Sequence, residues 1–101
     1  HEAIIEVGDY FFKIVCGCEE EPWEDELFGG SKECTVGAGT TVVWRFAGSE
    51  EHNVSSHTSS FGDSNNFIAG EYKHTFDIAG QYEYRCSLHP AEMSGYDVIV
   101  R

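Results

Sequence analysis

Residues 39–46, Gly-Thr-Thr-Val-Val-Trp-Arg-Phe, decide the fold class of this chain. The side chains alternate between two sets, with Val42, Trp44 and Phe46 on one side and Thr41, Val43 and Arg45 on the other. A period of two is typical of a β-strand that has one buried face and one face in water. The same alternation recurs at residues 81–86 and 96–101, so these stretches are also predicted to be strands.

Further strands and turns extend this pattern along the chain. Short apolar or β-branched runs predict strands at residues 3–7, 10–15, 54–56 and 72–78. Turn-forming residues separate the strands at 8–9, 37–39, 62–63 and 79–80. No stretch keeps a helical period for three turns. We therefore expect an all-β fold, with two antiparallel sheets packed face to face or a flattened Greek-key barrel.

The composition indicates one small acidic domain. A chain of 101 residues leaves room for a single domain over residues 1–101, and 41% hydrophobic with 14% aromatic residues is enough for one core. No apolar run approaches the roughly 20 residues that cross a bilayer, and no basic leader opens the sequence. We therefore expect a mature soluble chain without membrane insertion. The net charge of −12 disfavours binding to nucleic acid or anionic membranes and favours a basic partner.

Two short segments carry side chains that bind transition metals. Residues 86–93 read Cys-Ser-Leu-His-Pro-Ala-Glu-Met, and residues 51–54 read Glu-His-Asn-Val. Together they supply one thiolate, two imidazoles and one thioether. These are the donors of a copper electron-transfer site, in which two His and one Cys form a trigonal plane and Met makes a long axial bond. Because Cys86 follows two inward-facing tyrosines on a strand, its sulfur is predicted to point into the core, where the next turn can bring His89.

Several motifs in this order resemble the small blue copper proteins, the cupredoxins of the plastocyanin, amicyanin and pseudoazurin type. They are Gly-Thr-Thr-Val-Val-Trp at 39–44, His-Asn-Val at 52–54, Gly-Gln-Tyr-Glu-Tyr-Arg-Cys at 80–86, and His89 with Met93. The resemblance covers about residues 34–101. It implies a cupredoxin-like Greek-key β-sandwich of about eight strands, one type 1 copper ion at one pole, and one-electron transfer between larger redox proteins.

The resemblance also implies roles for individual residues. His52, Cys86 and His89 would be the equatorial copper ligands, and Met93 would be the axial ligand. The side chain of Asn53 would hold the ligand loops together by hydrogen bonds. Three residues separate His89 from Met93, where plastocyanin-like loops have four and amicyanin-like loops have two. Glu92 is therefore the alternative axial donor, and its oxygen would favour Cu(II) and lower the reduction potential.

The segment from Cys16 to Cys34 is longer and more acidic than its counterpart in the small cupredoxins. Residues 19–26 hold six carboxylates among eight residues, and they form either a solvated loop or a surface that steers the protein toward a basic redox partner. With Cys86 assigned to copper, Cys34 can pair with Cys16 or with Cys18. The spare thiol can be buried, join two chains, or enter a Cu(I) or Zn(II) thiolate site. One disulfide indicates an extracytoplasmic location: a periplasm, an organelle lumen or the cell exterior.

The leading interpretation is a type 1 copper protein that carries single electrons and catalyses nothing itself, because four protein ligands leave no open metal position for a substrate. By the resemblance, electrons would leave through an exposed His89, whose apolar neighbours Leu88, Pro90 and Ala91 would form the docking face. The alternative is a copper-binding or trafficking protein on the same fold, for which the extra cysteines and His1 are the supporting features. We expect a monomer, or a disulfide-linked dimer formed through the odd cysteine.

Overall fold

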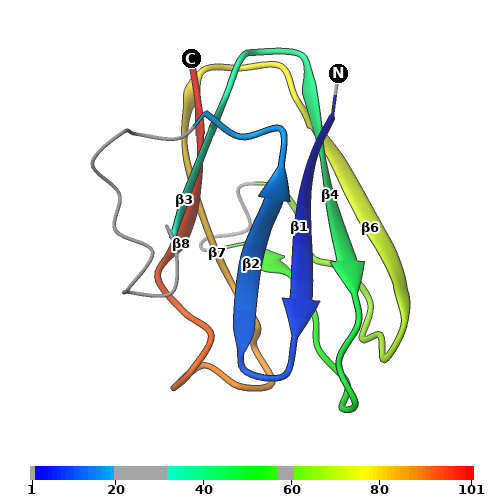
Figure 1. Cartoon of the computed structure of the whole chain (residues 1–101). Coiled ribbons are helices and arrows are strands. Elements are labelled where there is room, and N and C mark those ends of the chain that lie inside the picture. Colours follow the sequence, from blue (N-terminus) through cyan, green and yellow to red (C-terminus); the bar gives the residue numbers. More distant parts are fainter. Residues whose placement is uncertain (1, 20–31, 57–60) are drawn as a thin grey trace.

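The computed structural model describes residues 2–19, 32–56 and 61–101, which form two sheets packed face to face (Figure 1). The strands are β1 (Glu2–Gly8), β2 (Phe11–Cys16), β3 (Glu33–Val36), β4 (Thr40–Phe46), β5 (Ser55–Ser56), β6 (Gly70–Phe76), β7 (Gly80–Arg85) and β8 (Tyr96–Val100). One four-stranded sheet has the order β2-β1-β4-β6, and the other has the order β3-β8-β7-β5. The prediction of an all-β sandwich of about eight strands is confirmed. The described ranges hold no helix that could span a membrane.

The two sheets are mixed rather than antiparallel. β1 pairs in parallel with β4, and β3 pairs in parallel with β8, while the remaining neighbours are antiparallel. The expectation of purely antiparallel sheets is therefore wrong for one strand pair in each sheet. The cause is the connectivity, because the chain leaves the first sheet after β2 and forms β3 at the edge of the second sheet. It then returns to the first sheet, where β4 runs beside β1 in the same direction.

The core between the sheets is rich in aromatic rings. Trp44 of β4 is fully buried, stacks on Phe61 with ring centroids 5.7 Å apart, and meets Tyr84 of β7 edge-on at 5.3 Å. The inward-facing set predicted for β4 is buried throughout. Val43 of the opposite set is buried as well, at 3% exposed, so the predicted wet face is wrong there. Its burial agrees with the place of β4 inside its sheet, between β1 and β6.

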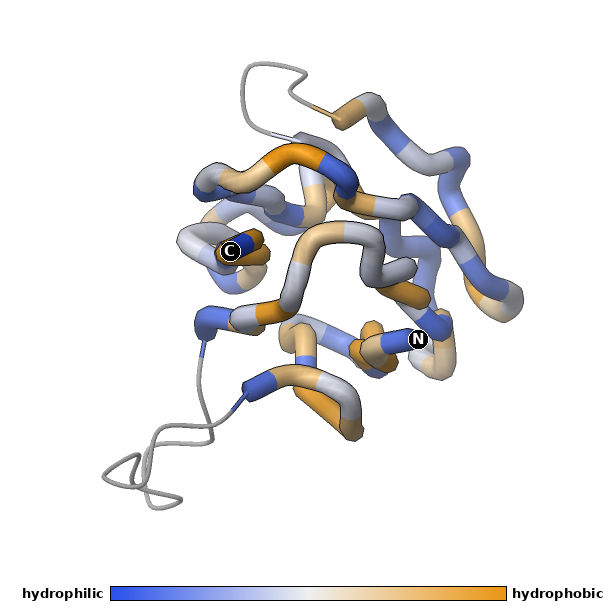
Figure 2. The backbone as a smooth tube through the Cα atoms, turned by 90° about the horizontal axis from the view of Figure 1, so that it is seen from above, coloured by the Kyte–Doolittle hydropathy of each residue, from blue (hydrophilic) through white to orange (hydrophobic). Residues whose placement is uncertain are grey.

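The directions of the strands bring three connections to one end of the sandwich. The turn after β1, the loop after β4 and the loop after β7 all lie at the lower end in Figure 1. This end is the site pole, because the predicted metal ligands lie in the latter two loops. β1 begins and β8 ends at the opposite pole, from which Figure 2 looks down on the two layers.

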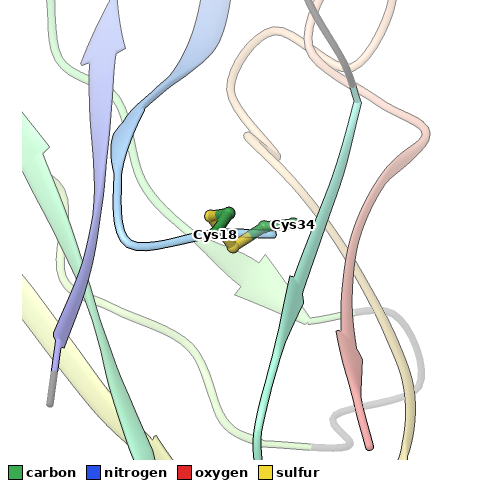
Figure 3. The surroundings of a disulfide bond; sticks show 2 residues. All are labelled: Cys18 and Cys34. Atoms are coloured by element: carbon green, nitrogen blue, oxygen red, sulfur yellow. A yellow bond between two sulfur atoms is a disulfide. The ribbon is translucent and has the colours of Figure 1, made fainter. Parts of the chain in front are cut away.

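A disulfide joins the segment after β2 to β3. Cys18 and Cys34 are bonded, with Cα atoms 5.1 Å apart (Figure 3). Of the two partners that the sequence left open for Cys34, the bonded one is Cys18, and Cys16 is a free, exposed thiol. Residues 20–26, the greater part of the acidic stretch, lie outside the described residues.

The backbone at Gly17 explains why Cys18, and not Cys16, reaches Cys34 in β3. Gly17 has a φ of +87°, and a Cβ added there would lie 2.3 Å from the carbonyl oxygen of Glu2. Only glycine adopts this conformation without strain and leaves room for β1. After the turn, the backbone N–H of Glu19 donates to the carbonyl oxygen of Thr35 at 2.8 Å, which places the segment beside β3.

Candidate metal centre

His52 is fixed at the site pole by contacts of its backbone and of both ring nitrogens. Its side chain is fully buried. Its backbone N–H donates to the carbonyl oxygen of Phe67 at 2.9 Å, and the N–H of Phe67 donates back to His52 at 2.9 Å. In the ring, Nδ1 faces Cys86 and Nε2 faces Asp9. The imidazole is therefore held in one orientation between two side chains.

Cys86 follows the last residue of β7 and places its thiol beside the His52 ring. The side chain is fully buried, as the alternation along β7 predicts, and Sγ lies 3.8 Å from Nδ1 of His52. Consider a transition metal with bonds of about 2.3 Å to sulfur and about 2.0–2.1 Å to nitrogen. At a trigonal angle of about 120°, its two donors would stand about 3.8 Å apart. The spacing of this pair therefore fits a shared metal ion.

Backbone hydrogen bonds fold residues 86–93 back on themselves. The N–H of Cys86 donates to the carbonyl oxygen of Met93 at 2.9 Å, and the N–H of Met93 donates to that of His89 at 2.9 Å. The side chain of Met93 is fully buried, whereas Glu92 is exposed. His89 is half-buried, and its ring centroid lies 4.9 Å from that of His52. These hydrogen bonds bring the backbone of Met93 beside that of Cys86 and tie His89 into the same loop.

The described part of the chain does not present a complete set of metal ligands. Within residues 2–19, 32–56 and 61–101, no three His, Cys, Asp or Glu side chains are grouped with the spacing of a metal site. The contact between His52 and Cys86 is a pair, and joint ligation with His89 and Met93 stays a prediction. His1 lies outside the described residues.

Asn53 links the loop after β4 to the loop after β7. Its Nδ2 donates to the hydroxyl of Ser87 at 2.8 Å and to Oδ1 of Asn66 at 3.1 Å. Its Oδ1 accepts the backbone N–H of Ser87 at 2.8 Å. These bonds join the segments that carry His52 and Cys86.

Asp9 contacts His52, although the sequence analysis did not place it among the site residues. Its Oδ1 lies 2.9 Å from Nε2 of His52, and its carboxylate also accepts hydrogen bonds from the backbone and hydroxyl of Ser49. These hydrogen bonds hold the pKa of the Asp9 carboxyl far below its ordinary value, and the bond with His52 has the largest effect. The sequence marked residues 8–9 only as a turn. The sequence holds one feature that could have pointed to Asp9: the turn follows a predicted strand, whose end could reach the site pole.

Tyr10, the next residue, contacts the second predicted histidine ligand. Its φ of 70° is in the left-handed region, which non-glycine residues rarely adopt. Its hydroxyl donates to Oε2 of Glu50 at 2.7 Å, and this hydrogen bond raises the pKa of Tyr10. Its ring meets that of His89 edge-on, with centroids 5.1 Å apart. The strand predicted at residues 10–15 begins at Phe11 in the structure, one residue later than predicted, and Tyr10 belongs to the turn.

Comparison with known proteins supports the fold assignment. A purple cupredoxin from Nitrosopumilus maritimus superposes with a TM-score of 0.66 at 24% sequence identity, over 99% of this chain and 98% of that chain. A mutant of amicyanin in its Cu(I) form gives a TM-score of 0.70 at 21% identity, over 99% of this chain and 82% of that chain. An oxidized form of another amicyanin mutant gives 0.64 at 22% identity, over 97% and 80%. No protein-family model and no curated protein matches the chain. The chain has the cupredoxin fold.

Proposed function

We propose that this protein is a small copper protein that carries single electrons, with a type 1 site formed by His52, Cys86, His89 and Met93. The observation that carries the proposal is the buried pair of His52 Nδ1 and Cys86 Sγ, 3.8 Å apart, at one end of a cupredoxin sandwich. With a second imidazole and a buried thioether in the adjoining loop, these side chains make up the donor set of a blue copper site. Copper bound there would supply one-electron chemistry between Cu(II) and Cu(I).

The role of the protein in this chemistry is to hold the metal-binding side chains in place. The ring of His52 is fixed by Asp9, and the backbone of Cys86 is fixed by its hydrogen bond to Met93. A donor set that is already positioned has little to rearrange when the charge of the metal changes. The energy needed for rearrangement during electron transfer is then small.

Burial favours Met93 over Glu92 as the axial ligand. The side chain of Met93 is fully buried, while Glu92 is exposed and can keep its carboxylate in water. Taking a carboxylate out of water costs on the order of several kcal/mol, whereas burying a thioether is favourable. The same four ligands would leave no open position for a substrate, so we propose no enzymatic activity.

We propose that electrons enter and leave through the edge of His89. This side chain is half-buried, and the neighbouring Leu88 is 42% exposed, with Pro90 and Ala91 exposed beside it. A redox protein could dock on this apolar face. Because the chain has a net charge of −12, the partner should be basic at its docking surface. Exposed charges are screened beyond about 8 Å at physiological ionic strength, so the association rate should fall steeply as salt rises.

The disulfide supports an extracytoplasmic location. Cys18 and Cys34 are joined in the structure, and such bonds persist in oxidising compartments such as a periplasm, an organelle lumen or the cell exterior. We further propose that residues 1–101 act as one domain, with an acidic insertion at about 16–34, and that the protein is a monomer. The exposed thiol of Cys16 is the group through which a disulfide-linked dimer would form.

The experiment that tests the function is the visible spectrum after one equivalent of Cu(II) is added to the metal-free protein. Wild type should turn intensely blue, because a thiolate bound to Cu(II) gives a strong charge-transfer band. Cys86→Ser should abolish the colour, and Cys16→Ser, which removes an exposed thiol, should keep it. A colourless wild-type protein would contradict the proposal. Reversible reduction and oxidation would then separate an electron carrier from a trafficking protein, which should release its copper to a chelating recipient.

A further inference from the structure

We propose that Asp9 is a positioning residue: its carboxylate orients His52 so that Nδ1 faces Cys86, and its charge favours the oxidised state of copper bound there. This inference rests on the proposed copper site. The contact that carries it is the 2.9 Å hydrogen bond between Asp9 Oδ1 and His52 Nε2.

The hydrogen bond determines which ring nitrogen of His52 carries the proton. An ionised carboxylate only accepts hydrogen bonds, so the proton lies on Nε2. A neutral imidazole has one ring proton, which leaves the lone pair of Nδ1 free. Nδ1 is also the nitrogen that lies 3.8 Å from Sγ of Cys86. Asp9 thereby keeps available the nitrogen that a shared metal ion would use.

Asp9 is itself held by the loop after β4. Its Oδ1 accepts the backbone N–H of Ser49 at 3.0 Å and that of Glu50 at 3.2 Å, and its Oδ2 accepts the hydroxyl of Ser49 at 2.6 Å. Gly48 provides the space, because a Cβ added there would lie 2.5 Å from Oδ1 of Asp9. The carboxylate therefore has its orientation before any metal binds, and the His52 ring takes its orientation from it.

A carboxylate bonded to a ligand imidazole also changes the properties of the metal. The carboxylate draws the Nε2 proton toward itself, which makes the lone pair of Nδ1 a stronger electron-pair donor to the metal. Its negative charge stabilises Cu(II) more than Cu(I), because Cu(II) carries one more positive charge. The ring between Asp9 and the metal position is fully buried, so solvent does not come between them there. We therefore expect Asp9 to lower the reduction potential.

The positioning role can be measured without any metal. Nitrogen-15 NMR of the metal-free protein at neutral pH should show the His52 ring proton on Nε2. Asp9→Asn should keep that proton on Nε2, because the amide oxygen accepts the same hydrogen bond, whereas Asp9→Ala should move part or all of it to Nδ1. A wild-type ring with its proton on Nδ1 would overturn the proposal.

The charge effect is measured by the reduction potential of the copper-loaded protein. Asp9→Asn removes the charge but can keep the hydrogen bond, so its potential should shift upward. Glu51→Gln is the matched control, because it removes one exposed carboxylate next to His52 in the sequence, and its shift should be clearly smaller. In Asp9→Ala, Cu(II) affinity should fall about 10–100-fold, the usual effect of losing a partner that orients a ligand. Equal shifts for Asp9→Asn and Glu51→Gln would overturn the charge effect.

The two proposals fail in different measurements. If the wild-type protein gave no blue colour with Cu(II), the proposed function would be wrong, and the effect of Asp9 on the potential would be wrong with it. The position of the ring proton in metal-free protein would still decide, separately, whether Asp9 orients His52.

Discussion

Asn53 pairs with Ser87 through both ends of its amide: Oδ1 accepts the backbone N–H of Ser87, and Nδ2 donates to its hydroxyl, both at 2.8 Å. Residue 53 follows His52, and residue 87 follows Cys86. One side chain therefore fixes the distance between the two loops that carry the buried imidazole and thiol.

Removing this amide should destabilise the metal-free protein. Asn53 is 7% exposed, and Asn53→Ala removes the three hydrogen bonds of its amide, two to Ser87 and one to Asn66. The expected loss in the free energy of unfolding is about 1–3 kcal/mol, measured by urea denaturation. Asn65→Ala, at an exposed position, is the control and should change it by less than about 0.5 kcal/mol. Similar losses in the two variants would mean that the link to Ser87 contributes little.

Replacing Met93, the proposed axial ligand, should change the reduction potential and keep the colour. Met93→Leu preserves an apolar side chain of similar size in a fully buried position, so the protein should fold and remain blue with copper. Its reduction potential should rise, because the axial ligand tunes the potential of such sites. Glu92→Gln should alter neither the spectrum nor the potential. The opposite result, an unchanged Met93 variant and an altered Glu92 variant, would identify the carboxylate as the ligand.

Adding one methyl group beside Asp9 should disturb the site. In Gly48→Ala the new Cβ would lie 2.5 Å from Asp9 Oδ1 and 3.1 Å from Nε2 of His52, so the carboxylate must move. Overpacking of this kind costs about 1–3 kcal/mol, and copper affinity should fall with the loss of the Asp9 contact. Gly37→Ala is the matched control, because a Cβ there meets nothing within 4 Å. Thermal unfolding and copper titration of both variants would show whether the site tolerates the methyl group.

Breaking the disulfide should lower stability, while removing the free thiol should not. The disulfide closes a loop between residues with a sequence separation of 16. The entropy that such a loop removes from the unfolded chain stabilises the fold by about 3 kcal/mol. The double variant Cys18→Ser, Cys34→Ser should therefore unfold at lower urea concentration than wild type. Cys16→Ser, at an exposed position, should unfold like wild type. If Cys16→Ser were the destabilised protein, the pairing would be with Cys16 instead.

High pH should weaken the fold through Tyr84. Burial raises the pKa of its hydroxyl well above the ordinary value of 10.0. Above about pH 10 the unfolded chain releases this proton while the native protein retains it, so the free energy of unfolding falls as pH rises. The contribution of one such group is up to about 1.4 kcal/mol per pH unit. Urea denaturation between pH 9 and 11 should show a smaller fall for Tyr84→Phe than for wild type, and parallel curves would contradict this assignment.

Local pattern was enough to predict most of the strands. The alternation through Trp44 and through Tyr84 correctly identified β4 and β7, because a strand between two layers of a sandwich must turn every second side chain inward. The same rule predicted a buried side chain at residue 86. β3 escaped this reasoning, because the four residues Glu33–Val36 are too few to show a period.

Contacts between distant segments could not be predicted in this way. Asp9 and His52 are 43 residues apart, and they meet because β1 and β4 run side by side in the same direction. The predicted antiparallel sheets did not include this parallel pairing of β1 with β4. The choice of Cys18 over Cys16 likewise depended on the left-handed backbone of Gly17, which the residue identities permit but do not require.

The chain ends give a practical way to orient the protein on a support. β1 begins and β8 ends at the pole remote from His89, so a linker attached at Arg101 would anchor the molecule by its far side. Immobilised in this way, the protein would turn the loop of the half-buried His89, with the exposed Leu88, toward the medium. If electrons pass through His89 as proposed, dissolved reductants would reach it from the medium, whereas electron exchange with the support would have to cross the whole sandwich.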